Sequence, residues 1–242
     1  MSALLELHHV EKRFGGLHAV KDVSLSVRAG EIVGLIGPNG AGKTTLFSCI
    51  AGYHRLTAGS IVFDGYEIAN HPAFKICRAG VARTFQVVKP FARMTVLQSV
   101  MVGTFLHHRD TPTARQSALA VLERLHMTHL ADVEAHSLTL VLKKRLEVAR
   151  ALATEPRLLL LDEVMAGLSP GEVPEILDVI HEINAGGVTV LFVEHIMAAV
   201  MTIAKRVVVL HHGELLADGT PAEVSRDPQV VSAYLGEEYA GA

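Results

Sequence analysis

The sequence predicts an α/β fold built around a parallel sheet, and three apolar runs are the main indication. The runs are Ile32–Ile36, Leu158–Leu161 and Val188–Val193. Each is apolar almost throughout, which is typical of a strand that is buried on both faces of a parallel sheet. Helix-forming stretches separate the runs along the chain. This alternation favours a sheet with helices packed against its faces.

A nine-residue loop joins the first apolar run to a helix expected from Leu46. The loop matches the pattern G-x-x-x-x-G-K-[ST] in the strand-loop-helix context that the pattern requires. Its glycines let the backbone curl so that N–H groups point inward, and the helix adds its positive end, so the loop can hold nucleotide phosphates. We expect Lys43 at the β- and γ-phosphates and the Thr44 hydroxyl on Mg²⁺. The predicted nucleotide-binding residues are Gly37, Pro38, Asn39, Gly40, Ala41, Gly42, Lys43, Thr44 and Thr45.

Two carboxylates end the second apolar run. Asp162 follows four leucines, and Glu163 comes directly after it. The carboxyl end of a parallel strand is where ligands bind in such sheets, and a buried carboxylate without a role is costly. We expect Asp162 to hold the Mg²⁺ shell and Glu163 to orient or deprotonate the attacking water.

Two more polar side chains end strands of the same predicted sheet. Gln86 closes a short strand that begins at Val81, and His195 follows the run that ends at Val193. Both would face the γ-phosphate, Gln86 through metal or water and His195 as a hydrogen-bond donor that also positions the water. The predicted catalytic set is Glu163, His195 and Gln86, and the predicted metal set is Thr44, Gln86 and Asp162.

Three shorter segments indicate a small antiparallel layer beside the main sheet. Leu4–His8 and Ser24–Val27 alternate partly between apolar and polar residues, and Ser60–Phe63 is followed by the hairpin dipeptide Asp64-Gly65. Phe14 lies beside two glycines between the first two segments. It would either stack on an adenine or pack in the core, and the spacing leaves both possibilities open.

Residues 87–153 are predicted to form an inserted helical subdomain. Three helical patterns lie in it or at its end: Val96–Gly103, Ala114–His126 and Leu142–Ala153. The core with its antiparallel layer would come from residues 1–86 and 154–242. That second part adds a helix over Glu172–Ala185 and a strand over Lys205–Leu210.

Composition limits the partners that are expected. The chain has 242 residues, a net charge of −3 and no basic block, which argues against nucleic acid. Charged residues make up 19%, below the usual share of about a quarter, so we expect other subunits to cover part of the surface. The start lacks a signal-peptide layout, and no uncharged apolar run reaches the roughly 18 residues of a membrane span. We therefore expect the protein in the cytosol or at the cytosolic face of a membrane.

Cysteine and histidine usage predicts neither a disulfide framework nor a zinc site. Cys49 and Cys77 are the two cysteines, and we expect both to be reduced packing residues. The 14 histidines lack the H-E-x-x-H spacing of a zinc helix. Neighbouring histidines on a strand should point apart. This applies to the pairs His8-His9, His107-His108 and His211-His212.

These elements together resemble, over nearly the whole chain, the ATP-binding subunit of ATP-binding-cassette (ABC) transporters. The general match rests on residues 37–45 (Walker A), Gln86 (Q-loop), Leu158–Glu163 (Walker B), Ala166–Ser169 (D-loop) and His195 (H-loop). Further segments resemble the group that imports branched-chain amino acids: Arg13–Gly16, Ala82–Gln86, Arg145–Leu152, Ala166–Pro170, Val193–His195 and Ala233–Gly236. The resemblance implies a P-loop NTPase core of the RecA-like type with a mixed sheet. It also implies ATP and Mg²⁺ as cofactors and Phe14 as the adenine-stacking residue.

The resemblance also implies partners. Family members form head-to-tail dimers that hold two ATP molecules between the P-loop of one subunit and the signature segment of the other, and they dock on integral membrane permease subunits. We expect a second ABC ATPase subunit, permease subunits, indirectly a substrate-binding protein, and a peripheral location at the cytoplasmic face of the inner membrane. The docking groove would be lined by the stretch after Gln86, including Phe91 and Met94, although either side chain would equally suit core packing.

The signature segment departs from the family pattern. Where the family has Leu-Ser-Gly-Gly-Gln, this chain has Leu138–Leu142 with the sequence LTLVL. Thr139 keeps a hydroxyl that can cap the helix and touch a γ-phosphate. Val141 replaces a glycine and Leu142 replaces a polar side chain, so we hypothesise a heterodimer in which the site completed by this segment turns over poorly. The alternative is that the segment tolerates such variants, because N–H groups at the helix N-terminus do most of the binding. The sequence leaves open whether the pair is a homodimer or a heterodimer.

Two other classes of function compete with a transport motor. A non-transport clamp of the same ATPase type, acting in DNA repair or on ribosomes, would carry long coiled-coil insertions or two cassettes, and neither pattern is visible in the sequence. A GTPase would need an Asn-Lys-x-Asp element, which is absent, and the set of Gln86, Asp162-Glu163 and His195 does not suit a nucleotide kinase.

Overall fold

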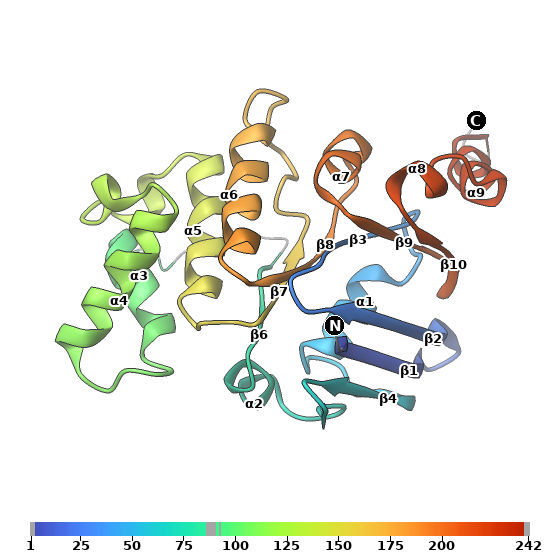
Figure 1. The fold of residues 1–242 in the computed structure, drawn as a ribbon, viewed down its shortest axis with the longest axis horizontal. Helices are drawn as coiled ribbons and strands as arrows, with labels where there is room; N and C mark the ends of the chain where they lie inside the picture. The colour runs from blue at the N-terminus through green and yellow to red at the C-terminus, as the bar shows by residue number, and fades with distance from the viewer. Residues whose placement is uncertain (1–2, 86–90, 92, 240–242) are drawn as a thin grey trace.

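The computed structural model describes residues 3–85, 91 and 93–239, and Figure 1 shows its ribbon. In chain order its strands, helices and 3₁₀ turns (η) are β1 Ala3–Phe14, β2 Leu17–Arg28, β3 Ile32–Ile36, α1 Lys43–Ile50, β4 Ala58–Phe63, β5 Tyr66–Glu67, α2 Ala73–Arg78, β6 Val81–Arg83, α3 Val96–Thr104, α4 Thr111–Arg124, η1 Thr128–Leu130, η2 Ala135–Ser137, α5 Leu140–Leu152, β7 Leu158–Asp162, α6 Val173–Ala185, β8 Thr189–Val193, α7 Met197–Ile203, β9 Arg206–His211, β10 Glu214–Gly219, α8 Pro221–Val224 and α9 Pro228–Tyr239.

The main sheet has six strands in the order β10-β9-β3-β8-β7-β6. The five strands from β9 to β6 pair in parallel, and β10 pairs antiparallel with β9 at the edge. The three apolar runs of the sequence form its centre as β3, β8 and β7, and every residue of these strands is buried. The prediction of an α/β fold with a mixed sheet is confirmed.

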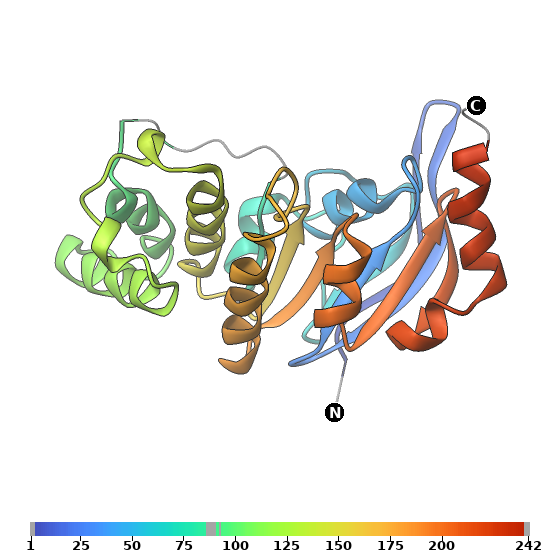
Figure 2. The ribbon, with the colours of Figure 1, turned by 90° about the horizontal axis from the view of Figure 1, so that it is seen from above.

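The sheet is buried because its two faces contribute to two separate apolar clusters. On β3, Ile32 and Ile36 pack into one cluster with α6 and α7, whereas Val33 and Leu35 pack into the other with α1 and the antiparallel strands. Figure 2 shows α6 and α7 on one face of the sheet and α1 on the opposite face. Burial on both faces explains why the central strands carry almost no polar residues.

The antiparallel layer is a four-stranded sheet in the order β2-β1-β4-β5. Its first two strands are each 12 residues long, so the predicted segments Leu4–His8 and Ser24–Val27 were too short. Register shifts interrupt the pairing, and His9 (φ 50°) and Asp22 (φ 51°) adopt left-handed backbone conformations that break the alternation of side chains. The predicted hairpin turn is present, since Asp64-Gly65 joins β4 to β5.

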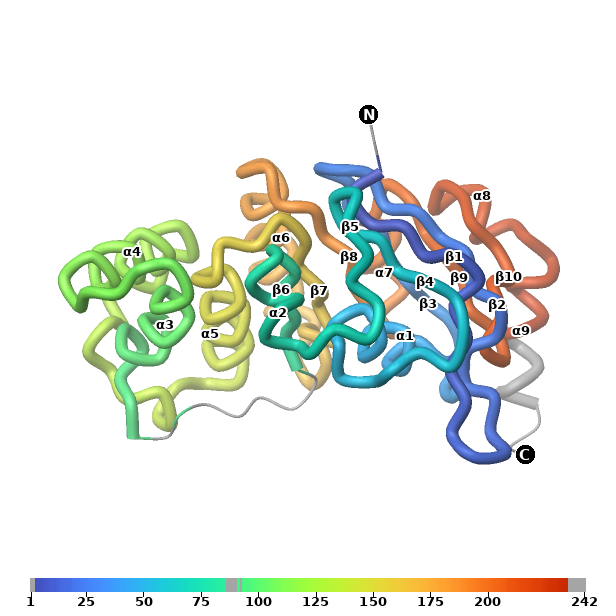
Figure 3. Tube along the Cα trace, turned by 90° about the horizontal axis from the view of Figure 1, so that it is seen from below, coloured from blue at the N-terminus to red at the C-terminus, as the bar shows by residue number. Residues whose placement is uncertain are grey.

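Helices α3, α4 and α5 gather at one end of the molecule, away from the antiparallel strands, as Figures 1 and 3 show. All three predicted helices are present there, with boundaries shifted by up to three residues. One apolar cluster runs from these helices into the main sheet. We therefore keep residues 87–153 as a proposed subdomain that packs on the core.

The hairpin of β9 and β10 differs from the sequence prediction. The strand predicted over Lys205–Leu210 is β9, and it continues through a turn at His212-Gly213 into β10, which was not predicted. In this turn His212 has φ 50°, and the rings of His211 and His212 lie 4.0 Å apart between centroids. The expectation that these two neighbours point apart was wrong, because one of them belongs to a turn and not to a strand.

Candidate nucleotide site

The glycine loop leaves β3 at Ile36 and enters α1 at Lys43. Gly37 (φ 147°) and Gly42 (φ 102°) are in backbone conformations that favour glycine, and a Cβ on either would overlap a main-chain carbonyl oxygen, of Leu210 and Ala19 respectively. The loop is also tied to the β9–β10 turn, since the N–H of Gly213 donates to the carbonyl oxygen of Ala41 at 3.0 Å. Its shape is therefore fixed by its surroundings.

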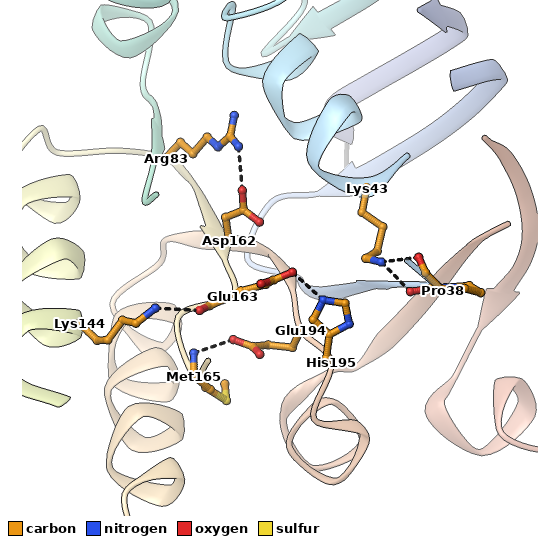
Figure 4. Close-up of polar contacts among 10 residues, drawn as sticks. Pro38, Lys43, Arg83, Lys144, Asp162, Glu163, Met165, Glu194 and His195 are labelled. Atoms are coloured by element: carbon orange, nitrogen blue, oxygen red, sulfur yellow. Dashed lines mark hydrogen bonds and ion pairs between the residues drawn. The ribbon is translucent and has the colours of Figure 1, made fainter. Parts of the chain in front are cut away.

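The lysine of the loop is buried and folded back over it. The Lys43 ammonium donates to the carbonyl oxygens of Gly37 at 2.6 Å and Pro38 at 2.8 Å, as Figure 4 shows. Only 6% of Lys43 is exposed. The ammonium therefore lies inside the curl of the loop, where its charge favours a phosphate group.

A cavity of about 690 Å³ opens over this loop. It brings together the glycine loop, the acid after β7 and the histidine after β8, and adds residues of β2 and of the β9–β10 turn. Its lining comprises Leu17, His18, Ala19, Lys21, Asn39, Gly40, Ala41, Gly42, Lys43, Thr44, Thr45, Glu163, His195 and His212. His18, Lys21 and His212 were not predicted as site residues, because only the tertiary packing of two distant hairpins brings them to the loop.

Glu163 and His195 are in direct contact. The Nε2 atom of His195 lies 2.6 Å from Oε1 of Glu163 (Figure 4), and Glu163 is only 8% exposed. The backbone of Glu163 is left-handed, with φ 51°, although the residue is not a glycine. Its N–H donates to the carbonyl oxygen of Val193 at 2.9 Å. The turn after β7 thus holds a strained conformation that aims the carboxylate at the cavity.

Asp162 is almost fully buried and paired on one side only. Its Oδ2 accepts a bond of 2.7 Å from Arg83, which also donates to Ser48 on α1 at 2.9 Å. Within the described residues, Oδ1 of Asp162 is buried and has no hydrogen-bond partner. The hydroxyl of Ser48 donates in turn to the main-chain oxygen of Thr44 at 2.7 Å, so a polar chain links the predicted metal residues. Arg83 was quoted only as part of a motif, without a role.

These donors fit a magnesium ion. No group of three or more His, Cys, Asp or Glu side chains that could hold a metal occurs among residues 3–85, 91 and 93–239. Mg²⁺ does not need such a group, because it usually keeps several waters and binds through one or two carboxylates together with substrate phosphates. The free oxygen of Asp162 is an acceptor of the required kind. Gln86, the third predicted metal residue, lies outside the described residues.

Two further buried ionisable side chains support the turn after β7, and neither was predicted to have a role. Glu194 is 2% exposed and accepts a bond of 2.8 Å from the N–H of Met165. Lys144 is 4% exposed and donates to the carbonyl oxygen of Glu163 at 3.0 Å. Burial raises the pKa of Glu194 from 4.5 to about 7 and lowers the pKa of Lys144.

The signature segment lies at the start of α5, outside the cavity of its own chain. Thr139 caps the helix by accepting a bond of 3.5 Å from the N–H of Leu142. Val141 is 8% exposed and belongs to the core cluster, and neither it nor its neighbours have a positive φ. The side chain of Val141 therefore points into the core, and the effect of replacing glycine at this position on a partner's nucleotide stays a prediction. The bulky residue at the surface is Leu140, with 44% exposed.

The predicted adenine and docking residues lie near the surface. Phe14 is 40% exposed, meets His54 edge-on at 5.1 Å between ring centroids, and does not line the cavity. Phe91 is 39% exposed with Arg150 of α5 over its ring at 4.4 Å, and Met94 is 36% exposed. The stretch 86–90, which would line much of the docking groove, lies outside the described residues.

A family model described as "ABC transporter" matches residues 20–166, more than half of the chain. The chain belongs to the ABC transporter family. A second model, described as "Branched-chain amino acid ATP-binding cassette transporter", matches residues 214–240 of this ABC ATPase. Nucleotide binding and ATP hydrolysis follow from the family and from the site described above.

The ABC ATPase is similar to characterised relatives over almost its full length. It is 42% identical to the high-affinity branched-chain amino acid transport ATP-binding protein BraF of Pseudomonas aeruginosa, covering 97% of this chain and 98% of the relative. The same values hold for LivG of Salmonella typhimurium. Among solved structures, the ADP conformation of the ATP-binding cassette MJ1267 is 31% identical with a TM-score of 0.89, covering 98% of this chain and 100% of that chain.

Among the described residues of this ABC ATPase, none of the helices has the length and apolar character that crossing a membrane requires.

The buried Glu194 predicts a pH-dependent stability. Its pKa is raised in the folded state, so between pH 4.5 and about 7 the folded chain binds more protons than the unfolded chain, and stability falls as pH rises through this window. Glu194→Gln, which keeps an oxygen acceptor for Met165, should flatten the profile of thermal midpoints between about pH 5 and about pH 8. The matched control is Glu123→Gln on α4, which removes an exposed carboxyl. Parallel profiles for wild type and Glu194→Gln would show that the buried carboxyl does not titrate as described.

Proposed function

We propose that this chain is the ATP-hydrolysing subunit that powers a membrane importer of branched-chain or other amino acids, or of related small solutes. The observation that carries the proposal is the convergence of the glycine loop, Glu163 and His195 on one cavity. The names of BraF and LivG, relatives that match along nearly the whole chain, support the solute class.

The residues of the cavity divide the chemistry among them. When nucleotide binds, the Lys43 ammonium would leave the carbonyl oxygens of the loop and donate to the β- and γ-phosphates. The N–H groups of the loop would donate to the same phosphates. Glu163 orients or deprotonates the attacking water, and His195 holds the Glu163 carboxylate and donates toward the γ-phosphate. Mg²⁺ would be held by Thr44, Asp162 and Gln86 and would supply charge stabilisation on the phosphate oxygens.

The proposed assembly contains further subunits. A second ABC ATPase subunit, identical or different, would complete the two nucleotide sites, with Thr139 contributing to the partner's site. Integral permease subunits would hold the pair at the cytoplasmic face of the inner membrane, and a substrate-binding protein would deliver the solute to them. The low share of charged residues, 19%, fits a surface that is partly covered by other subunits.

Removal of the catalytic carboxylate should separate binding from hydrolysis. Glu163→Gln keeps the size of the side chain but removes the base, so ATP affinity should stay close to wild type while turnover falls by at least about a hundredfold. A fluorescent ATP analogue measures the affinity, and phosphate release measures the turnover. Undiminished turnover in this variant would contradict the role of Glu163.

Transport itself is tested in the assembled complex. The chain, its partner ATPase, the co-purifying permease subunits and the binding protein are reconstituted in liposomes, and ATP-dependent uptake of radiolabelled leucine is measured. Uptake should require ATP and should be lost with Glu163→Gln, which serves as the matched non-hydrolysing control. Recovery of the chain in the soluble fraction, without any integral membrane partner, would favour the non-transport clamp.

The variant signature segment predicts unequal turnover at the two sites of the dimer. Leu140 stands at the surface of the first turn of α5, where its side chain would obstruct the approach of a partner's nucleotide. The double change Leu140→Gly and Leu142→Gln should therefore raise the ATPase rate of the complex, at most to the sum of two working sites. Val141→Gly is the matched control, because it removes a buried side chain and opens no space at the surface. An unchanged rate in the double variant would show that the helix N–H groups suffice.

A further inference from the structure

Lys144 connects the signature helix to the turn that carries the catalytic glutamate. It lies on α5, five residues after Thr139, which corresponds to about 7.5 Å along the helix axis. Its ammonium donates to the main-chain oxygen of Glu163 at 3.0 Å, and the side chain is 4% exposed. Figure 4 shows it reaching from α5 to the end of β7.

The main chain of Glu163 needs such support. A left-handed conformation is strained for a non-glycine residue, and it persists only where neighbours hold it. Here the N–H of Glu163 is held by Val193 and its carbonyl oxygen by Lys144. Two residues further on, the N–H of Met165 is held by the buried carboxylate of Glu194. The direction of the Glu163 side chain therefore depends on a donor that comes from another element.

If this position only had to fill space, an apolar side chain would avoid the cost of burying an ammonium group. Burial lowers the pKa of Lys144, and the nearby carboxylates of Glu194, Glu163, Glu147 and Asp162 oppose that shift. Replacing a whole buried ion pair by apolar side chains of similar volume is often neutral or stabilising, whereas removing one partner alone leaves the other charge uncompensated. The charge of Lys144 is better explained by its hydrogen bond to the carbonyl oxygen of Glu163 than by a contribution to folding stability.

The same two regions also come close at Leu140. The Cδ2 atom of Leu140, in the first turn of α5, lies 3.3 Å from the position that a Cβ would occupy on Gly167. Gly167 belongs to the loop that follows Glu163. Helix α5 thus binds the catalytic turn through Lys144 and comes close to the same loop again at Leu140.

We propose that Lys144 is a positioning residue that couples the two nucleotide sites of the dimer. When the signature segment engages the nucleotide bound by the partner, a shift of α5 is passed through the Lys144 ammonium to the carbonyl oxygen of Glu163, and the carboxylate at this chain's own nucleotide moves with it. The coupling rests on the proposed dimeric function.

The experiment uses the assembled transporter and measures the ATPase rate as a function of ATP concentration. Lys144→Met keeps an unbranched side chain and removes the donor. It should lower kcat by about tenfold, since small misplacements of a catalytic group are costly, leave the half-saturating ATP concentration within about twofold, and reduce the Hill coefficient toward one. Lys144→Arg keeps a charged donor and should restore most of the rate and of the cooperativity.

A control variant, a substitute variant and the wild-type complex separate the possible outcomes. Lys143→Met changes the neighbouring, half-buried lysine and should leave rate and Hill coefficient unchanged. If Lys144→Met unfolds, as judged from the thermal midpoint, Lys144→Gln replaces it, because its amide is too short to reach the same oxygen without a shift of α5. Wild-type rate and cooperativity in whichever of the two variants folds would overturn the coupling. A wild-type complex without ATP-dependent uptake would instead overturn the proposed transport function.

Discussion

The whole site depends on the parallel register of three central strands. Leu35 of β3 pairs with Val193 of β8, which pairs in turn with Asp162 of β7. The strands therefore end at the same level of the sheet, and neighbouring strands lie about 4.8 Å apart. Gly37 follows β3 by one residue and Glu163 follows β7 by one, so the phosphate loop and the carboxylate leave the same edge of the sheet on either side of β8. A slip of one residue in either pairing would turn Asp162 to the other face.

Buried ionisable side chains gather at the same edge of the sheet. Lys43, Lys144, Asp162, Glu163 and Glu194 are each at most 8% exposed, and all of them lie at or next to the carboxyl ends of β3, β7 and β8. Each buried ion is costly to desolvate unless it has partners. Lys43 finds its partners in its own loop. Lys144 and Glu194 instead bind main-chain groups of the turn after β7, so this turn is supported by residues that are far apart in the sequence.

The parts of the site that rest on local sequence were predictable, and the parts that rest on packing were not. The loop from Gly37 and the acids at the end of β7 follow from patterns of nine or fewer residues, because apolar runs and glycine spacing dictate them. The full lengths of β1 and β2 were missed, since the left-handed residues His9 and Asp22 interrupt the alternation. Lys144 and Glu194 were missed because a lysine on an amphipathic helix and a glutamate after a strand are ordinarily exposed.

The signature segment shows why helix phase matters more than residue type. A sequence comparison suggests that Val141 stands in the place of a ligand-facing glycine, yet the helix turns this side chain into the core and leaves Leu140 outside. The first N–H groups of α5 still point out of the helix, where they can donate to an anion. The variant segment therefore keeps these donors and places the exposed side chain of Leu140 beside them. Leu140 also faces the loop that follows Glu163, since its Cδ2 atom lies 3.3 Å from the position that a Cβ would occupy on Gly167.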